Sequence, residues 1–165
     1  MIRESAGATP FGVFQLADAF RLAAQETAGK DRKLTSGPTR LLVYHACELF
    51  LKAYLREHGQ GVEALRSYGH DLDAMLAAAI AEGLHPSPQI SAQLKKATGK
   101  NDYVRVRYIV VEGPSDISAE NVISLVDAVR DCVRQALGYD DLGMPIPPES
   151  QIGLSWCGRR DAIEG

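Results

Sequence analysis

The sequence has few cysteines and no long apolar run, and both absences exclude classes of protein. The three cysteines, Cys47, Cys132 and Cys157, are far apart and form no CxxC pair, so neither a zinc ribbon nor a dithiol redox motif is indicated. No uncharged apolar stretch is long enough to cross a bilayer, and the N-terminal MIRESAGATPFGVF lacks the apolar core of a signal peptide. We therefore expect a cytoplasmic protein without a membrane partner, in which Cys47 and Cys132 are small core residues.

A strong charge imbalance is also missing. The net charge of −3 over 165 residues argues against a protein whose whole surface binds nucleic acid, although a local basic patch remains compatible with it. One segment, QLKKATGKNDYVRVRY, has such a local excess. It carries five basic residues against one acid, Asp102, and the five are Lys95, Lys96, Lys100, Arg105 and Arg107. Tyr103 and Tyr108 lie among them, which suits phosphate contacts combined with base stacking, and a solvated charged face is the alternative.

Apolar periodicity and helix-end signals predict an all-α protein, an up-and-down bundle of about five helices. Thr9-Pro10 and Asp71 are expected to cap helix starts. The predicted helices cover about 9–29, 36–58, 69–83, 88–98 and 118–137. Residues 104–110 alternate like a strand, but one strand has nothing to pair with, so we expect a helical turn followed by extended chain.

The end of the chain, from Tyr139 onward, is rich in glycine and proline and cannot form a long helix. It still contains apolar residues, namely Met144, Ile146, Ile152, Leu154 and Trp156. We therefore divide the chain into a bundle, residues 1–138, and an extended C-terminal arm, residues 139–165. The arm is predicted to pack on its own bundle or on a neighbouring subunit.

A polar line crosses the otherwise apolar segment HACELFLKAYLREHG. His45, Glu48, Lys52 and Arg56 follow a helical spacing and share one face of the second predicted helix. One interpretation is structural, with a Glu48–Lys52 ion pair and His45 hydrogen-bonded nearby. In the other interpretation, the line borders a polar cleft between helices or a dimer seam.

The same segment, followed by GHDLDAML, resembles the HEPN superfamily (higher eukaryotes and prokaryotes nucleotide-binding). Its members often show His-Ala-x-Glu-Leu-x-Leu-Lys-Ala, a glycine-containing loop, and His-x-Leu-x-x-Leu at the start of the next helix. The matching positions are, in the first segment, His45, Ala46, Glu48, Leu49, Leu51, Lys52 and Ala53, and in the second, His70, Leu72, Met75 and Leu76. The resemblance covers about residues 11–137, and it implies a bundle of four or five helices that usually dimerises.

Family members that cleave RNA without a metal carry an arginine and a histidine separated by four to six residues. In them the histidine is the general base and the arginine holds the phosphate. Arg40 and His45 have this spacing here, but they lie on the second helix rather than on the late helix where the family places the motif. No histidine follows Arg105 or Arg107 at the later position. His45, His70 and Arg40 are therefore the catalytic candidates of an atypical ribonuclease.

The resemblance and the basic segment together predict binding of a nucleotide or an RNA phosphate backbone, in a defence, toxin–antitoxin or RNA-processing setting. The expected ligand-binding residues are Arg105, Arg107, Tyr108, Lys100 and Tyr103, with His45, Glu48 and Lys52 lining a cleft. A non-catalytic dimerisation or adaptor module is the further alternative. Expected partners are a second copy of the chain, RNA or a nucleotide, and a nucleotidyltransferase protein. No cofactor and no metal are expected, because His70 to Asp73 fit a helix start better than a metal site.

Overall fold

Helices make up the regular structure of the residues that the structure describes. The computed structural model describes residues 9–28, 36–108 and 119–147, and within these ranges it has seven α-helices and no strand. The helices are α1 (Pro10–Ala28), α2 (Gly37–Glu57), α3 (Val62–Ser67), α4 (Leu72–Ala81), α5 (Pro88–Gly99), α6 (Asp102–Arg105) and α7 (Ala119–Ala136). The predicted all-α class is confirmed, and α1, α2, α4, α5 and α7 are the five predicted helices. No helix in the described ranges is both long and apolar enough to span a membrane.

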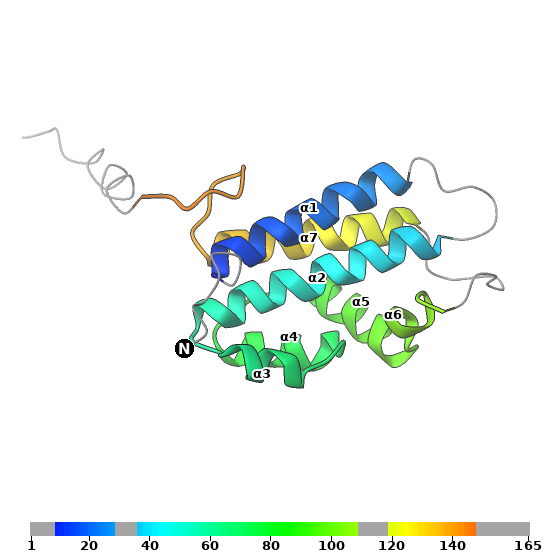
Figure 1. The fold of residues 1–165 in the computed structure, drawn as a ribbon, viewed down its shortest axis with the longest axis horizontal. Helices are drawn as coiled ribbons and strands as arrows, with labels where there is room; N and C mark the ends of the chain where they lie inside the picture. Colours follow the sequence, from blue (N-terminus) through cyan, green and yellow to red (C-terminus); the bar gives the residue numbers. More distant parts are fainter. Residues whose placement is uncertain (1–8, 29–35, 109–118, 148–165) are drawn as a thin grey trace, which may run out of the picture.

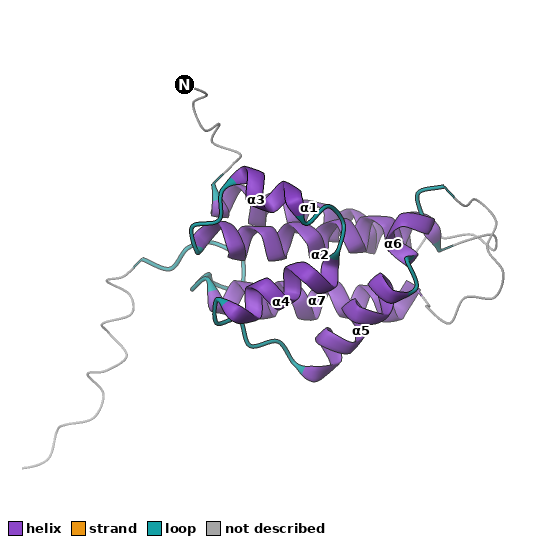
Figure 2. Cartoon of the chain, turned by 90° about the horizontal axis from the view of Figure 1, so that it is seen from below, coloured by secondary structure: helices purple, strands orange, loops and turns teal. Residues whose placement is uncertain are grey.

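The three long helices α1, α2 and α7 lie side by side, and the shorter helices α3 to α6 lie beneath α2 (Figure 1). The view from below shows these shorter helices in the foreground (Figure 2). Helix α2 is the central element because it packs against α1, α3, α4, α6 and α7. Its apolar residues are accordingly inaccessible to solvent on several sides, as at Val43, Cys47, Phe50 and Leu55. Every polar side chain on α2 therefore needs a partner or a route to the surface.

Side-chain hydrogen bonds cap the starts of two helices, α1 and α4. The Thr9 hydroxyl accepts a hydrogen bond from the Gly12 amide at 3.0 Å, and the Asp71 carboxylate accepts one from the Ala74 amide at 2.9 Å. Both residues act as the predicted caps, which satisfy amides that have no partner within the helix. Helix α4 begins at Leu72, directly after the predicted Asp71 cap.

Helix α3 was missed by the sequence analysis. It has six residues, of which only Leu65 is buried. One buried residue gives no apolar periodicity, so a helix this short has no detectable pattern.

The ambiguous stretch after α5 is helical where the structure describes it. Asn101 has a positive φ of 53°, and this left-handed residue turns the chain from α5 into α6. The helix α6 and a turn through residue 108 follow. The predicted helical turn is thus confirmed, whereas the extended continuation from residue 109 lies outside the described residues.

The first part of the C-terminal arm packs on the bundle of its own chain. The Tyr139 ring meets Phe11 and Phe14 edge-on, with centroids 5.9 and 5.1 Å apart. The Gln15 side chain donates to the Gly143 carbonyl at 3.0 Å. The later arm residues named above, Ile152, Leu154 and Trp156, lie outside the described residues, so the position of that part of the arm stays a prediction.

Candidate functional site

A buried carboxylate organises the polar line on α2. Glu48 is 3% exposed, and its Oε1 accepts a hydrogen bond from Lys52 Nζ at 2.5 Å. Its Oε2 accepts hydrogen bonds from the Tyr103 hydroxyl at 2.7 Å and from His70 Nδ1 at 3.0 Å. Burial alone raises the pKa of this carboxyl, but the hydrogen bonds from Lys52, His70 and Tyr103 lower it below its usual value. Glu48 is therefore an anion at neutral pH, and it gathers side chains from three separate segments.

His70 connects this carboxylate to an arginine. Its Nδ1–H donates to Glu48, which leaves Nε2 as the acceptor of a 2.8 Å hydrogen bond from Arg107 Nη1. In this assignment the carboxylate fixes the tautomer and the orientation of the ring. The side chain of His70 is 42% exposed, so the contact with Arg107 lies at the surface end of the network.

Arg107 is held in place by a second interaction. Its guanidinium carbon lies 4.6 Å from the centroid of the Tyr103 ring, in a cation–π arrangement. The His70 ring also meets Tyr103 edge-on, with centroids 5.2 Å apart. The guanidinium is thus oriented by an aromatic face and an imidazole nitrogen, without a direct ion pair to Glu48 in the described contacts.

His45 forms the far end of the same network. Its Nδ1 lies 3.1 Å from the Tyr103 hydroxyl, and because that hydroxyl donates to Glu48, the imidazole N–H donates to it. The ring packs edge-on against Phe20 at 4.5 Å. Desolvation lowers the pKa of His45, and the nearby positive charge of Arg107 adds to this against the opposing effect of Glu48. Burial and the Glu48 charge raise the pKa of Tyr103, which stays a hydroxyl.

Five side chains therefore surround Glu48 in one connected group, the Glu48 cluster: His45, Lys52, His70, Tyr103 and Arg107. Three hydrogen bonds in series, through Glu48 and Tyr103, join the two histidines.

The sequence places these side chains together by simple local rules. The spacing of His45, Glu48 and Lys52 puts them on one face of α2. Gly69 has a φ of +57°, which a residue with a side chain rarely adopts, and it sets His70 directly before the Asp71 cap.

A second buried network anchors α6 on α2. Arg40 is 1% exposed and contacts the Asp102 carboxylate at 3.3 Å, and the Tyr44 hydroxyl donates to Asp102 at 2.7 Å. Burial raises the pKa of Tyr44, and the Asp102 hydrogen bond adds to this. The structure thus places Arg40 in the interior, joined to Asp102, whereas His45 belongs to the Glu48 cluster.

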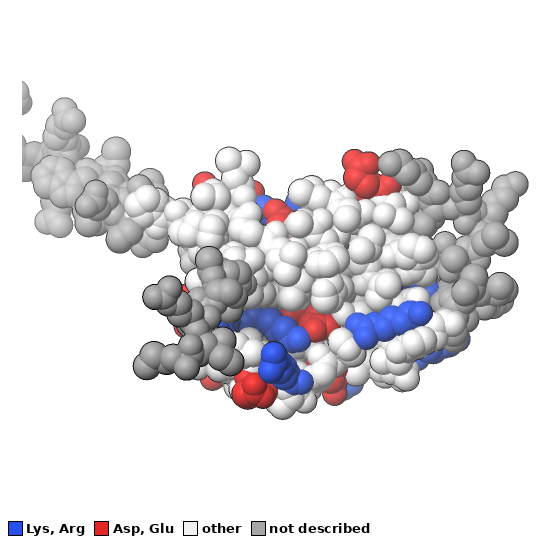
Figure 3. All heavy atoms as spheres, viewed as in Figure 1, with Lys and Arg blue, Asp and Glu red and all other residues white. Residues whose placement is uncertain are grey.

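The remaining candidates lie at the surface next to α6. Lys100 and Arg105 are exposed, and Tyr108 is 79% exposed. Basic side chains line the lower edge of α2 on both sides of an acidic group (Figure 3). The described residues contain no group of three or more histidine, cysteine or acidic residues that could hold a metal ion.

Sequence reasoning missed the roles of Asp102 and Tyr44. In the sequence, Asp102 is the one acid of a basic segment, and its burial beside an arginine 62 residues away gives no local signal. The only available hint was that Arg40 and Tyr44, four residues apart on an apolar helix, both need a polar partner.

Comparison with known proteins gives one match. A family model described as the HEPN domain matches residues 38–136, which extend from the start of α2 to the end of α7 and include the whole Glu48 cluster. Neither the curated proteins nor the solved structures contain a match. Because the family model covers more than half of the chain and the fold is a helical bundle, the chain belongs to the HEPN domain family.

Proposed function

We propose that this HEPN domain binds the phosphate backbone of RNA, or a nucleotide, at the surface around Arg107. Membership of the HEPN family supports a nucleotide- or RNA-related function in general. The observation that carries the proposal is the orientation of Arg107, whose guanidinium is held by the Tyr103 ring and by His70 Nε2 at the surface end of the Glu48 cluster. A planar guanidinium fixed in this way is suited to phosphate oxygens.

Further basic side chains and an exposed aromatic ring support nucleic acid binding at the same surface. The two cations of the Glu48 cluster, Lys52 and Arg107, outnumber its single carboxylate. Arg105, two residues before Arg107 in the sequence, adds an exposed charge, and the exposed ring of Tyr108 offers a face on which a base can stack. Such contacts bind single-stranded nucleic acid without reading its sequence, because every base has a stacking face.

The binding proposal is tested by fluorescence anisotropy of a labelled single-stranded RNA oligonucleotide at low salt. We expect Arg107→Ala to weaken binding by about tenfold or more, since it removes a charge-assisted phosphate contact. Arg66→Ala is the matched control because it also removes one arginine, from an exposed ion pair with Glu63 on α3. Equal affinity of the two variants would refute this site.

A second candidate function, a metal-independent ribonuclease, is favoured by one observation. His70 has its Nδ1–H fixed by a carboxylate and its Nε2 next to a guanidinium, which is the arrangement of a general base beside a phosphate-binding group. In this reading, His70 Nε2 takes the proton of a ribose 2′-hydroxyl and Arg107 moves from His70 to the phosphate. The buried Arg40 has no part in that reaction.

The ribonuclease candidate predicts cleavage of a generic RNA in the presence of EDTA. Cleavage should be lost in His70→Ala and kept in His85→Ala, a change of an exposed histidine outside the Glu48 cluster. Retained cleavage in His70→Ala would assign the activity to other residues or to a contaminant.

We further propose that the domain forms a homodimer, through the largely uncharged face over α1 and α2 (Figure 3). Leu16 and Leu22 on α1 are 49% and 50% exposed, and Leu49 on α2 is partly buried. An exposed apolar face of this kind marks an interaction surface. Leu16→Lys with Leu22→Lys should shift the mass measured by light scattering from dimer to monomer, whereas Val62→Lys, at an exposed valine on α3, should not.

If the domain is instead an adaptor, the dimer variant should abolish partner binding and Arg107→Ala should have no effect. A nucleotidyltransferase encoded by a neighbouring gene is the protein partner to test in a toxin–antitoxin setting, by co-purification with the full chain.

A further inference from the structure

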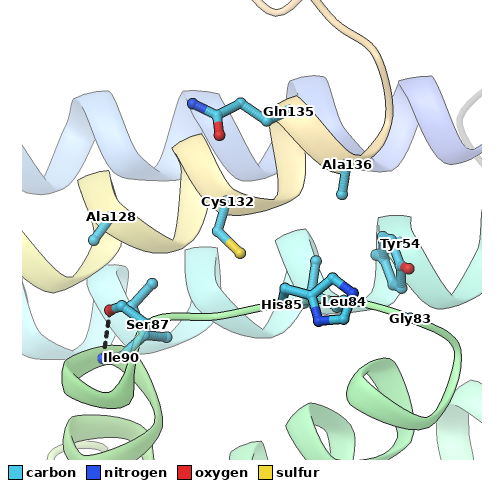
Figure 4. A pocket seen from close by; sticks show the side chains of 10 residues that line it. All are labelled: Tyr54, Gly83, Leu84, His85, Ser87, Ile90, Ala128, Cys132, Gln135 and Ala136. Atoms are coloured by element: carbon cyan, nitrogen blue, oxygen red, sulfur yellow. Dashed lines mark hydrogen bonds between the residues drawn. The ribbon is translucent and has the colours of Figure 1, made fainter.

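A groove of about 570 Å³ lies between α7 and the loop that joins α4 to α5 (Figure 4). None of its lining residues belongs to the Glu48 cluster. Leu84 and Ile90, which are 2% and 6% exposed, contribute to its lining from the loop and from α5. The helix α2 contributes Tyr54, whose hydroxyl donates to the Glu82 carbonyl at 3.0 Å.

Three of the four side chains that α7 contributes to the groove are small. Ala128, Cys132 and Ala136 follow each other at intervals of four residues, so they form one stripe along the helix (Figure 4). Desolvation raises the pKa of the Cys132 thiol, so this thiol is uncharged where it lines the groove. Polar groups, such as His85 and Gln135, belong to exposed residues. The groove is suited to apolar side chains and to the close approach of another backbone.

The C-terminal arm brings the chain close to one end of this groove. The amide of Asp140 donates to the Met144 carbonyl at 2.8 Å, and the amide of Ile146 donates to the Gly138 carbonyl at 3.1 Å. The arm therefore reverses direction and returns to Gly138, two residues after Ala136. The described chain ends at residue 147, next to this return point.

The residues that follow have an apolar pattern that fits the groove. Ile152, Leu154 and Trp156 alternate with glycine and serine. In an extended chain, alternate side chains point to the same side, so these three would form one apolar edge. The five steps from residue 147 to Ile152 reach at most about 17 Å.

We propose that residues 152–156 of the same chain bind in this groove in an extended conformation and place the Trp156 ring against the α7 stripe. This proposal is independent of RNA binding at Arg107. The occupant is the C-terminal segment of the same chain. The experiments below distinguish it from a second copy of the chain or an added ligand in the groove.

The first test uses the fluorescence of Trp156, which is the only tryptophan of the chain. We expect the full-length protein to emit at the short wavelengths of a buried indole. Ala136→Glu, which puts a charge into the groove, should shift the emission to the red. Ala77→Glu on the exposed side of α4 is the matched control and should leave it unchanged.

Three results would overturn the proposal. Emission typical of a water-exposed indole in the unmutated protein would show that the segment is not bound. An unchanged spectrum in Ala136→Glu would place Trp156 elsewhere. Emission that depends on protein concentration would show that the segment binds to a second copy.

The second test measures the alkylation of Cys132 by iodoacetamide in the full chain, in a Cys157→Ser background, with mass spectrometry to locate the label. A bound segment shields Cys132, so Trp156→Ala should accelerate its alkylation by about tenfold. Leu142→Ala, at a residue that is 79% exposed and outside the groove, should not. Equal rates in the two variants would overturn the proposal.

Discussion

Replacing Glu48 by glutamine should destabilise the fold strongly, because it removes the charge on which the Glu48 cluster depends. The change keeps the size of the side chain and one carbonyl oxygen. It puts an NH2 group among three donors, since Lys52, Tyr103 and His70 all donate to the present carboxylate. At least one donor then loses its acceptor in a site that is 3% exposed.

The magnitude follows from burial. Breaking a buried ion pair by removing one partner typically costs about 3–5 kcal/mol. The Lys52 side chain is 18% exposed and keeps some hydration, so we expect the lower end of this range, about 3 kcal/mol. For a chain of this length, that corresponds to a decrease in Tm of about 6–12 °C.

Urea unfolding followed by circular dichroism measures this loss. Glu63→Gln is the matched control, because Glu63 also pairs with a basic residue on its own helix but its side chain is 87% exposed. The control should change the free energy of unfolding by less than about 0.5 kcal/mol. A loss below about 1 kcal/mol in Glu48→Gln would refute the view that this carboxylate holds the three segments together.

Three further predictions follow from the same structure. Folding lowers the pKa of His45 and of Glu48 below their ordinary values of 6.5 and 4.5, so the folded state binds fewer protons than the unfolded state. The urea concentration at the unfolding midpoint should therefore fall as the pH decreases from 7.5 through these values. His45→Gln should reduce the part of that decrease above pH 5, and an unchanged profile would contradict the shift at His45. Gly143→Ala should lower the Tm in thermal unfolding, because residue 143 has a φ of +79° and a Cβ there would lie 2.8 Å from Cε1 of Phe14. Gly61→Ala is the control: a Cβ at residue 61 meets no atom within 4 Å, so this change should have little effect on the Tm. Tyr103→Phe removes the hydroxyl that donates to Glu48 and accepts from His45. We expect the free energy of unfolding measured in urea to fall by about 2 kcal/mol, and a change near zero would contradict the assigned hydrogen bonds.

Much of the fold could be predicted from the sequence because its signals are local. Thr9, Asp71 and the Pro38 position mark helix starts, and the apolar periodicity of the long helices is continuous. Helix α3 could not be predicted, since one buried leucine has no period.

The site was predictable in its parts but not in its connections. The line of His45, Glu48 and Lys52 on one helix face follows from spacing, and the Glu48–Lys52 pair is present as the structural interpretation expects. Which distant residues join them is set by tertiary packing. Tyr103 reaches Glu48 because Asn101 turns the chain and buried Asp102 fixes α6 against Arg40, and neither effect is visible in a single sequence.

The salt dependence of RNA affinity measures whether Arg107 and its neighbours bind nucleic acid phosphate. For single-stranded nucleic acid, the slope of log affinity against log salt concentration changes by about 0.7 for each phosphate contact. We predict that Arg105→Ala with Arg107→Ala makes this slope shallower by about 1.4 and weakens binding at low salt. An unchanged slope, or no RNA binding by the unmutated protein at low salt, would contradict phosphate binding by these two arginines.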